Sequence, residues 1–288
     1  MTDHVGDVAV HRFGGTGPPL LISHATGFHG RCYEPMARGL EDRFGTVALD
    51  YRGHGDTPAP PDGSAAWSGF GDDAEAVAVE LSQGPGATGG LFGFGHSLGG
   101  AGLVMAASRR PGLFRRLVLF EPIISPPGIG LPDDVDPDST PLVAAARRRR
   151  ATFGSLDEAF ANYANKPPLA SFDPDALWAY VSHGFAVDGD EVRLKCDPEY
   201  EAETFRRAFD ARVWDLLASL EIPVTVIAGT KQPEREPHRH GSACRRGAAP
   251  RELRRPPRPR PLRPDDAPRR RRRPGARGVS ARPRLNGN

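Results

Sequence analysis

Short apolar runs alternate with helix-like segments along the first 123 residues, and this alternation is the strongest constraint on the fold. Each run ends in a glycine-rich or polar turn, so we expect strands buried in a sheet at residues 8–11, 19–23, 46–49, 90–95 and 116–120. Helical spacing over residues 31–42, 72–81 and 98–109 lies between them. Strands joined by helices imply right-handed crossovers, so the sequence predicts an α/β fold with a mostly parallel sheet flanked by helices.

The alternation pauses after residue 124 and resumes once. Residues 125–215 are strongly charged and mostly helical in pattern, with Pro and Gly at the joints, which predicts a helical cap inserted between two core strands. The apolar run at 222–229 then supplies one more buried strand. The expected organisation is a first part of the core at 1–124, a cap at 125–215, a core strand within 216–232 and a separate tail at 233–288.

The composition of the chain changes abruptly at about residue 233. Residues 233–288 contain 18 Arg, no Lys and 5 acidic residues, a net charge of 18 − 5 = +13, so the first 232 residues carry 2 − 13 = −11. The tail has 11 Pro and no Phe, Trp or Tyr. It cannot bury enough apolar surface to offset the entropy of ordering, so we expect it to be disordered.

Two hypotheses explain this tail. Arg, Pro, Gly and Ala have codons rich in G and C, so a GC-rich gene read out of frame yields such a composition, and a frame slip near codon 231 would produce the abrupt change. The alternative is a genuine basic tail. It would bind nucleic acid through the phosphate backbone in a salt-dependent way.

Other bulk features narrow the class of protein. The 38% hydrophobic content allows a sizeable core, and the three cysteines are widely spaced, with neither metal-ligand nor disulfide-framework spacing. The polar first residues do not form a signal peptide, and no run of ~18 apolar residues is present. We therefore expect a cytoplasmic protein with reduced thiols, a small-molecule substrate, no cofactor or metal, and no membrane association.

The segment Gly95-His96-Ser97-Leu98-Gly99 fits the pattern G-x-S-x-G, in which a serine sits on a sharp turn between a strand and a helix. Glycines flank the serine because bulk at those positions would clash with the neighbouring backbone. The turn exposes the hydroxyl at a helix N-terminus, where the helix dipole favours developing negative charge. Here the pattern follows a predicted strand and opens a predicted helix, so Ser97 is the candidate nucleophile.

Four landmarks together resemble the α/β-hydrolase superfamily, in its branch of small cap-bearing bacterial hydrolases. They are the segments 23–27 (Ser-His-Ala-Thr-Gly), 50–56 (Asp-Tyr-Arg-Gly-His-Gly-Asp), 95–100 and 120–122 (Phe-Glu-Pro), and the resemblance covers residues 18–230. It implies an oxyanion hole built from the N–H of Leu98 and an N–H of the loop 24–27, which follows the strand 19–23, with Thr26 the first candidate and Ala25 the second. Segment 50–56 is expected to be a structural turn, with Arg52 tied to carboxylates.

The resemblance also implies a catalytic acid and a catalytic histidine, in the order Ser, acid, His. The loop 230–236, where many relatives carry the acid, has no Asp, whereas Glu121 directly follows the strand 116–120 and is the candidate acid. After the last predicted strand only His238 and His240 occur, both inside the Pro/Arg-rich tail. A serine without a general base keeps its proton and is a poor nucleophile.

Three further histidines are candidates to line the substrate pocket. His24 and His96 flank the predicted site, and the alternative for both is a structural role, such as hydrogen bonds that fix the loop. His183 lies in the predicted cap, and the alternative for it is packing or exposure to solvent.

The function predicted is hydrolysis of a small ester-like substrate by a serine nucleophile. The alternatives are a non-catalytic or inactive protein with this fold, and a nucleic-acid-binding protein that acts through the basic tail.

Overall fold

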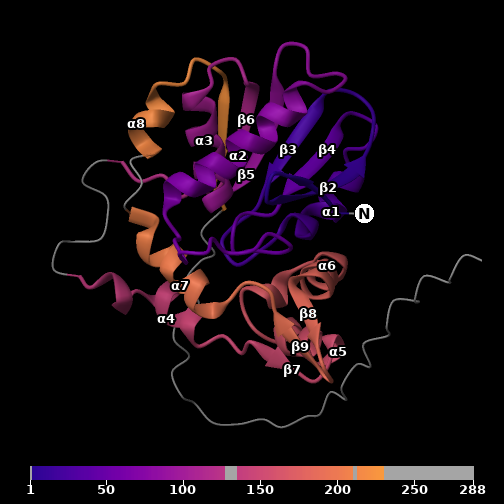
Figure 1. Ribbon diagram of the computed structural model, residues 1–288, viewed down its shortest axis with the longest axis vertical. Coiled ribbons are helices and arrows are strands. Elements are labelled where there is room, and N and C mark those ends of the chain that lie inside the picture. Colours follow the sequence, from indigo (N-terminus) through magenta and orange to yellow (C-terminus); the bar gives the residue numbers. More distant parts are fainter. Residues whose placement is uncertain (1, 127–134, 210–212, 230–288) are drawn as a thin grey trace, which may run out of the picture. The chain divides into compact units, whose positions relative to one another are not determined.

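A seven-stranded sheet runs through the computed structural model, which describes residues 2–126, 135–209 and 213–229 (Figure 1). The strand order is β1-β2-β4-β3-β5-β6-β10. The bounds are β1 Thr2–Val5, β2 Val8–Gly14, β3 Pro19–Ser23, β4 Gly45–Leu49, β5 Leu91–His96, β6 Phe114–Phe120 and β10 Val224–Ile227. From β4 through β10 neighbouring strands are parallel, whereas β2 pairs antiparallel with both β1 and β4. The prediction of a mostly parallel sheet is confirmed.

The sequence pattern did not predict β1. This strand forms a hairpin with β2, in which Val5 pairs with Val8 across the two residues Gly6 and Asp7. Gly6 has φ +58°, a conformation that glycine adopts without strain, so the Gly-Asp turn was the available signal.

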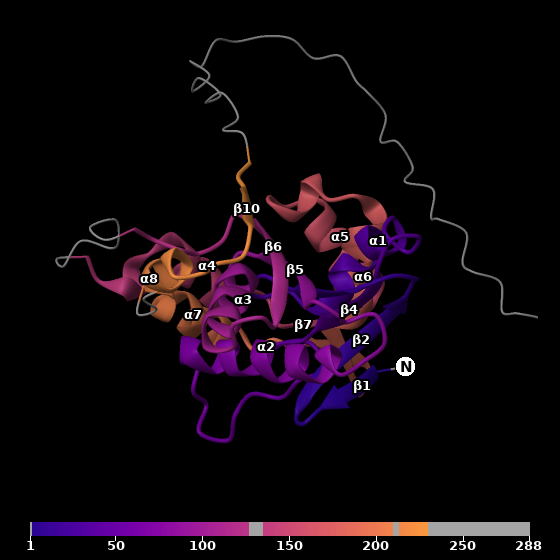
Figure 2. The same ribbon diagram turned by 90° about the horizontal axis from the view of Figure 1, so that it is seen from above.

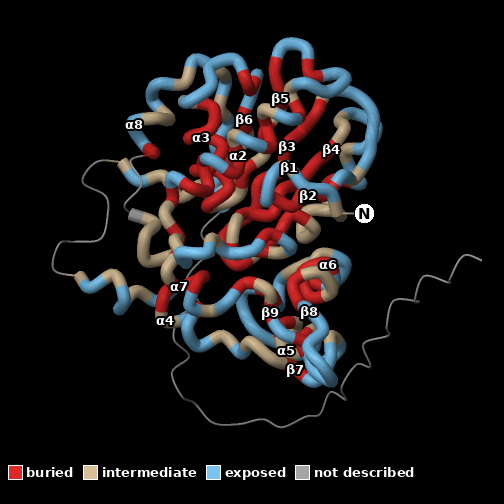
Figure 3. Tube along the Cα trace, in the orientation of Figure 1, coloured by how far each residue is buried: buried red, intermediate tan, exposed pale blue. Residues whose placement is uncertain are grey.

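Helices cover both faces of the sheet, because alternate residues of each buried strand point to opposite sides. On one face α2 (Trp67–Ser82), α3 (Leu98–Arg109) and α8 (Val213–Ala218) pack against side chains such as Leu21, Leu49 and Leu117. On the other face the short helices η1 (Gly30–Tyr33) and α1 (Glu34–Arg38) pack against Leu20 and Ile22. Figure 2 shows these two layers, and Figure 3 shows the strands as the most buried part of the molecule.

Two predicted helices have different bounds in the structure. The helix expected at 31–42 is the shorter pair η1 and α1, which ends where Gly39 follows Arg38. The helix expected at 72–81 begins earlier, at Trp67, since Trp67 and Phe70 both pack into the core. No helix within the described ranges combines the length and the apolar character needed to cross a lipid bilayer.

Between β6 and α8 the chain forms what we call the inserted segment, residues 135–209. It contains α4 (Pro141–Arg147), β7 (Thr152–Phe153), α5 (Leu156–Ala164), α6 (Pro174–Gly184), β8 (Phe185–Asp188), β9 (Glu191–Leu194) and α7 (Pro198–Arg206). It has its own apolar cluster, which Phe28 and Cys32 of the sheet domain join. The tail expected at 233–288 lies outside the described residues.

The inserted segment is not purely helical. Strands β7, β9 and β8 form a small antiparallel sheet, which the prediction of a helical cap did not include. In β9 the buried Val192 and Leu194 alternate with the exposed Glu191 and Arg193. This period-2 pattern is only four residues long, too short to stand out among the neighbouring helices.

Candidate active site

Ser97 lies at the junction of β5 and α3 with φ 54° and ψ −116°, a strained conformation for a residue with a side chain. Its N–H donates to the Phe120 carbonyl (3.0 Å). Its carbonyl accepts from the N–H groups of Gly100 (3.0 Å) and Ile123 (3.2 Å). The Ala101 N–H makes a longer bond to the same carbonyl (3.4 Å), so four partners from two neighbouring segments hold this backbone in place.

The glycines around Ser97 are required by space. A Cβ at Gly95 would lie 2.6 Å from the Gly100 Cα, and a Cβ at Gly99 would lie 2.1 Å from the Ser23 carbonyl oxygen. Both distances are far below van der Waals contact, and both neighbours are backbone atoms that cannot swing aside. The turn packs so tightly between β3 and α3 that no larger residue fits at either position.

Two backbone N–H groups are candidates for the oxyanion hole. Leu98 is the first residue of α3, so its N–H belongs to the helix turn that has no intrahelical acceptor. In the loop after β3, the Phe28 N–H donates to the Ala25 carbonyl (3.0 Å) and Gly27 has φ +75°, which together close a tight turn. The Ala25 N–H donates to the Tyr33 hydroxyl (3.3 Å), whereas the Thr26 N–H takes no part in the turn's hydrogen bond. This arrangement favours Thr26 over Ala25.

Glu121 directly follows β6 and has φ 43°. Among the described residues, Glu121 and Ser97 are the two non-glycine residues with positive φ. Its N–H donates to the Ile227 carbonyl (2.8 Å), and its Oε1 accepts from the Gly229 N–H (2.9 Å). The carboxylate therefore lies across the carboxyl end of β10, at the edge where the chain leaves the sheet.

His24 is fully buried, and both its ring nitrogens have backbone partners. Nδ1 donates to the Ala25 carbonyl (2.8 Å), and Nε2 accepts from the Tyr51 N–H (2.9 Å). Burial lowers the pKa of His24 to about 3, so the ring is neutral. These contacts tie the loop after β3 to the end of β4 and leave no ring atom for a substrate.

His96 and His183 are more accessible. The Tyr33 hydroxyl is hydrogen-bonded to His96 Nδ1 (2.8 Å), and the His96 ring contacts the rings of Phe28 and Phe120. Burial lowers the pKa of His96, and the charge of Glu121 opposes that shift. His183, on α6, has its ring centroid 6.4 Å from that of His29, and burial lowers its pKa to about 4.

The structure thus brings together Ser97, the Leu98 and Thr26 N–H groups, Glu121 and His96 at the carboxyl ends of β3, β5 and β6. Across residues 2–126, 135–209 and 213–229, no hydrogen bond joins the Ser97 hydroxyl to a histidine. His238 and His240 lie outside the described residues.

Segment 50–56 forms the predicted structural turn. Asp50 is buried and accepts from His11 Nε2 (2.8 Å) and from the N–H groups of Gly30 (2.6 Å) and Asp56 (2.8 Å). Burial alone would raise the pKa of Asp50, but the hydrogen bond and charge of His11 hold it well below its usual range. The predicted carboxylate partner of Arg52 is Asp73, at 2.6 Å.

His11, Asp50 and Asp56 are close enough together to be considered as metal ligands, with their ligand atoms within 4.8 Å of one another. Asp50 already accepts three hydrogen bonds, and Asp56 forms an ion pair with Lys195 (2.5 Å). The existing bonds account for this cluster as a structural network.

Sequence reasoning missed the contacts between the inserted segment and the loop after β3. His29 Nε2 donates to the Tyr180 carbonyl (3.0 Å), and the Tyr180 ring lies 5.4 Å from that of Phe28. A buried ion pair between Arg149 and Glu201 also lies against this loop. No local pattern signals pairings across 50 to 170 residues of chain.

A mostly parallel sheet with a strained serine between a strand and a helix, and a carboxylate at the end of the next strand, defines an α/β-hydrolase fold. A family model described as "Serine aminopeptidase, S33" matches residues 19–233, and the chain belongs to this family of the α/β-hydrolase superfamily.

Two curated relatives match part of the chain. A 2-(acetamidomethylene)succinate hydrolase from Mesorhizobium japonicum is 35% identical over 107 residues, which is 37% of this chain and 36% of the relative. Lipase LipV from Mycobacterium tuberculosis is 30% identical over 157 residues, which is 51% of this chain and 55% of the relative. The chain thus aligns with about a third to about half of these relatives.

The crystal structure of E-2-(acetamidomethylene)succinate hydrolase has a TM-score of 0.61 at 22% identity. The match covers 80% of this chain and 90% of that one. At this identity the likeness concerns the fold.

Proposed function

We propose that Ser97 is the nucleophile of a hydrolase that cleaves small ester-like substrates. The observation that carries this proposal is the backbone of Ser97, which lies between β5 and α3 and is held at φ 54° by four backbone hydrogen bonds. A fold retains such strain where the conformation serves a function, and here it lifts a hydroxyl to the N-terminus of a helix.

In the proposed reaction the Ser97 oxygen attacks the substrate carbonyl carbon, and the carbonyl oxygen becomes an oxyanion. The N–H groups of Leu98 and Thr26 are the proposed donors to that oxyanion. Removing one such donor typically costs about 3–4 kcal/mol of transition-state stabilisation. The intermediate then collapses as the leaving group takes a proton, and water releases the acyl group.

The proton steps need a base, and Glu121 indicates where that base belongs. Its carboxylate spans the end of β10, so it would orient a histidine that comes from the chain beyond this strand. Because no described histidine bonds to Ser97, we expect this chain to turn over esters slowly.

The test is hydrolysis of p-nitrophenyl acetate by the chain and by its Ser97→Ala variant, together with mass-spectrometric location of a fluorophosphonate adduct. An adduct on Ser97, and a rate that Ser97→Ala removes, would support the proposal. If neither is observed, the chain is a non-catalytic member of the family.

The names of the two curated relatives extend the proposal only to a chemical class. One acts on an acetamidomethylene succinate and the other is named a lipase, so both names concern carbonyl substrates attacked by water. We therefore propose a carboxylic ester or a related acyl compound, and no particular metabolite.

A further inference from the structure

The turn that presents the Thr26 N–H is closed on one side by the inserted segment. An ideal Cβ at Gly27 would lie 2.2 Å from Glu201 Oε1 and 3.1 Å from Arg149 Nη1. The carboxylate of α7 therefore rests directly on the Cα of Gly27, with no space between them. Glycine at this position is needed both for its φ of +75° and for this contact.

Glu201 is itself fixed by a buried network. Its side chain is 7% exposed and forms an ion pair with Arg149, which is 16% exposed. The second guanidinium nitrogen of Arg149 donates to the hydroxyls of Tyr180 and Tyr163 (3.3 Å for Tyr163). A guanidinium presents its donors in a rigid planar fork, so it sets the position of all three partners at once.

The same network reaches the other side of the turn. Tyr180 accepts from Arg149 through its hydroxyl, packs its ring 5.4 Å from that of Phe28, and accepts from His29 through its carbonyl. Gly27 thus contacts Glu201, and Phe28 and His29 both contact Tyr180. Glu201 and Tyr180 are the two residues that Arg149 binds on either side.

We propose that Arg149 is a positioning residue for the oxyanion hole, acting through Glu201 on Gly27 and through Tyr180 on Phe28. In this role it fixes the direction of the Thr26 N–H without touching substrate. The inference rests on the proposed function of Ser97 and adds to it a control of the site by the inserted segment.

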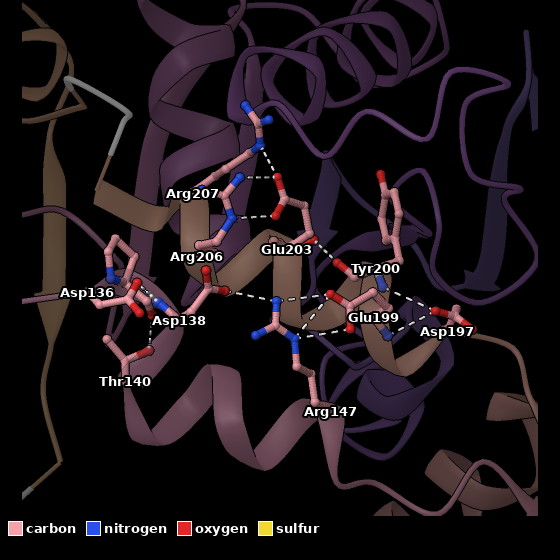
Figure 4. Close-up of polar contacts among 12 residues, drawn as sticks. Asp136, Asp138, Thr140, Arg147, Asp197, Glu199, Tyr200, Glu203, Arg206 and Arg207 are labelled. Carbon is pink, nitrogen blue, oxygen red and sulfur yellow. Dashed lines mark hydrogen bonds and ion pairs between the residues drawn. The ribbon is translucent and has the colours of Figure 1, made fainter.

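The chain offers a matched control two residues away. Arg147, the last residue of α4, forms ion pairs with Glu199 of α7 (3.0 Å) and with Asp138 (2.8 Å), as Figure 4 shows, and its side chain is 37% exposed. Such an exposed pair contributes little, so Arg147→Met should remove an ion pair to α7 without affecting the loop after β3.

The experiment compares Arg149→Met, Arg149→Lys and Arg147→Met in the full chain by two readouts. The first is hydrogen–deuterium exchange of the peptide covering residues 24–30. The second is fluorophosphonate labelling of Ser97, separated into a binding constant and a rate constant for bond formation. Arg149→Lys keeps the positive charge, but a single ammonium group cannot span Glu201 and Tyr180 together. This variant carries the test if Arg149→Met does not fold.

We expect Arg149→Met to speed exchange of residues 24–30 about tenfold or more and to lower the rate constant on the order of 10- to 100-fold, with the binding constant within about twofold. Arg149→Lys should give an intermediate loss, and Arg147→Met should behave as the unmodified chain. Unchanged exchange and labelling in folded Arg149→Lys and Arg149→Met would overturn the proposal, as would an equal effect of Arg147→Met. If Ser97 in the unmodified chain takes no label, the proposed function fails, and the exchange measurement alone decides the positioning role.

Discussion

Deleting one nucleotide within codons 230–232 should convert this chain into a more stable and far more active hydrolase. After such a deletion the tail is read from the second base of each present codon. For codons 254–262, Arg-Arg-Pro-Pro-Arg-Pro-Arg-Pro-Leu, the genetic code then allows Val-Val-Leu-Pro-Gly-x-Gly-His-Phe. The code thus allows an apolar run followed by a Gly-His dipeptide, which would supply the catalytic histidine that the α/β-hydrolase resemblance implies.

The other alternative frame cannot supply this histidine. Reading from the third base gives a histidine codon only where the next residue is Ile, Met or Thr, and residues 251–288 contain none of these. A two-nucleotide deletion is therefore a matched control, since it replaces the tail without restoring a base.

The expected gain in stability follows from the edge of the sheet. Val226 and Ile227 of β10 are 56% and 43% exposed, and a strand paired beside β10 would cover them. Full burial of such a side chain stabilises by about 1.5–3 kcal/mol, so covering about half of each gives roughly 2 kcal/mol. For a domain of this size that corresponds to an increase in Tm of roughly 4–8 °C.

The assay is thermal unfolding and p-nitrophenyl acetate hydrolysis of the original chain, the two deletion variants and the one-nucleotide variant carrying Ser97→Ala. A correctly placed general base should raise kcat by on the order of 10²- to 10⁴-fold in the one-nucleotide variant alone. If both deletions give the same Tm and the same rate as the original chain, the frame-slip reasoning is refuted. The basic tail is then genuine, and its salt-dependent binding to nucleic acid becomes the function to measure.

Three more predictions concern the site and its surroundings. Gly99→Ala should abolish fluorophosphonate labelling of Ser97, because its Cβ would lie 2.1 Å from a carbonyl oxygen, whereas Gly63→Ala, which meets open space, should keep it; retained labelling in Gly99→Ala would show that the turn can relax. Burial lowers the pKa of His24 to about 3 and of His54 to about 4, so both are neutral in the fold while the unfolded chain binds their protons below about pH 6.5. Stability is then complete above that pH and falls by roughly 2 kcal/mol per histidine at pH 5, which urea unfolding at pH 7.5 and pH 5 measures, and His54→Gln should reduce the loss; an unchanged unfolding midpoint would contradict this. Glu121→Gln, made in the frame-restored chain, should lower kcat by on the order of 10²- to 10⁴-fold in ester hydrolysis, and full activity would assign the acid elsewhere.

The sequence predicted the sheet domain because its signals are local. The runs 20–22 and 117–120 are apolar throughout and are followed by the polar residues Ser23 and Glu121, so composition and length agree on a buried parallel strand. The turn at Ser97 carries its glycines within five residues, which is why its position is also apparent from the sequence.

The parts that the sequence could not predict depend on distant pairings. The contact of Gly27 with Glu201 joins residues 174 positions apart, and the ion pair of Arg149 with Glu201 spans 52 positions. In the sequence Arg149 lies within a run of four arginines, which reads as a solvated helix face. Only the folded chain distinguishes Arg149, whose side chain is 16% exposed, from Arg147 and Arg150, which are exposed.

Every backbone partner of Ser97 comes from residues 100–123, and Ser23, which restricts the turn at Gly99, comes earlier still. During translation these residues all leave the ribosome before the inserted segment and the tail, and N-terminal elements fold first. An error downstream therefore leaves the serine turn built as it would be in an active relative. If the tail is the product of a frame slip, one compensating nucleotide change in it would be enough to return the gene to selection for turnover.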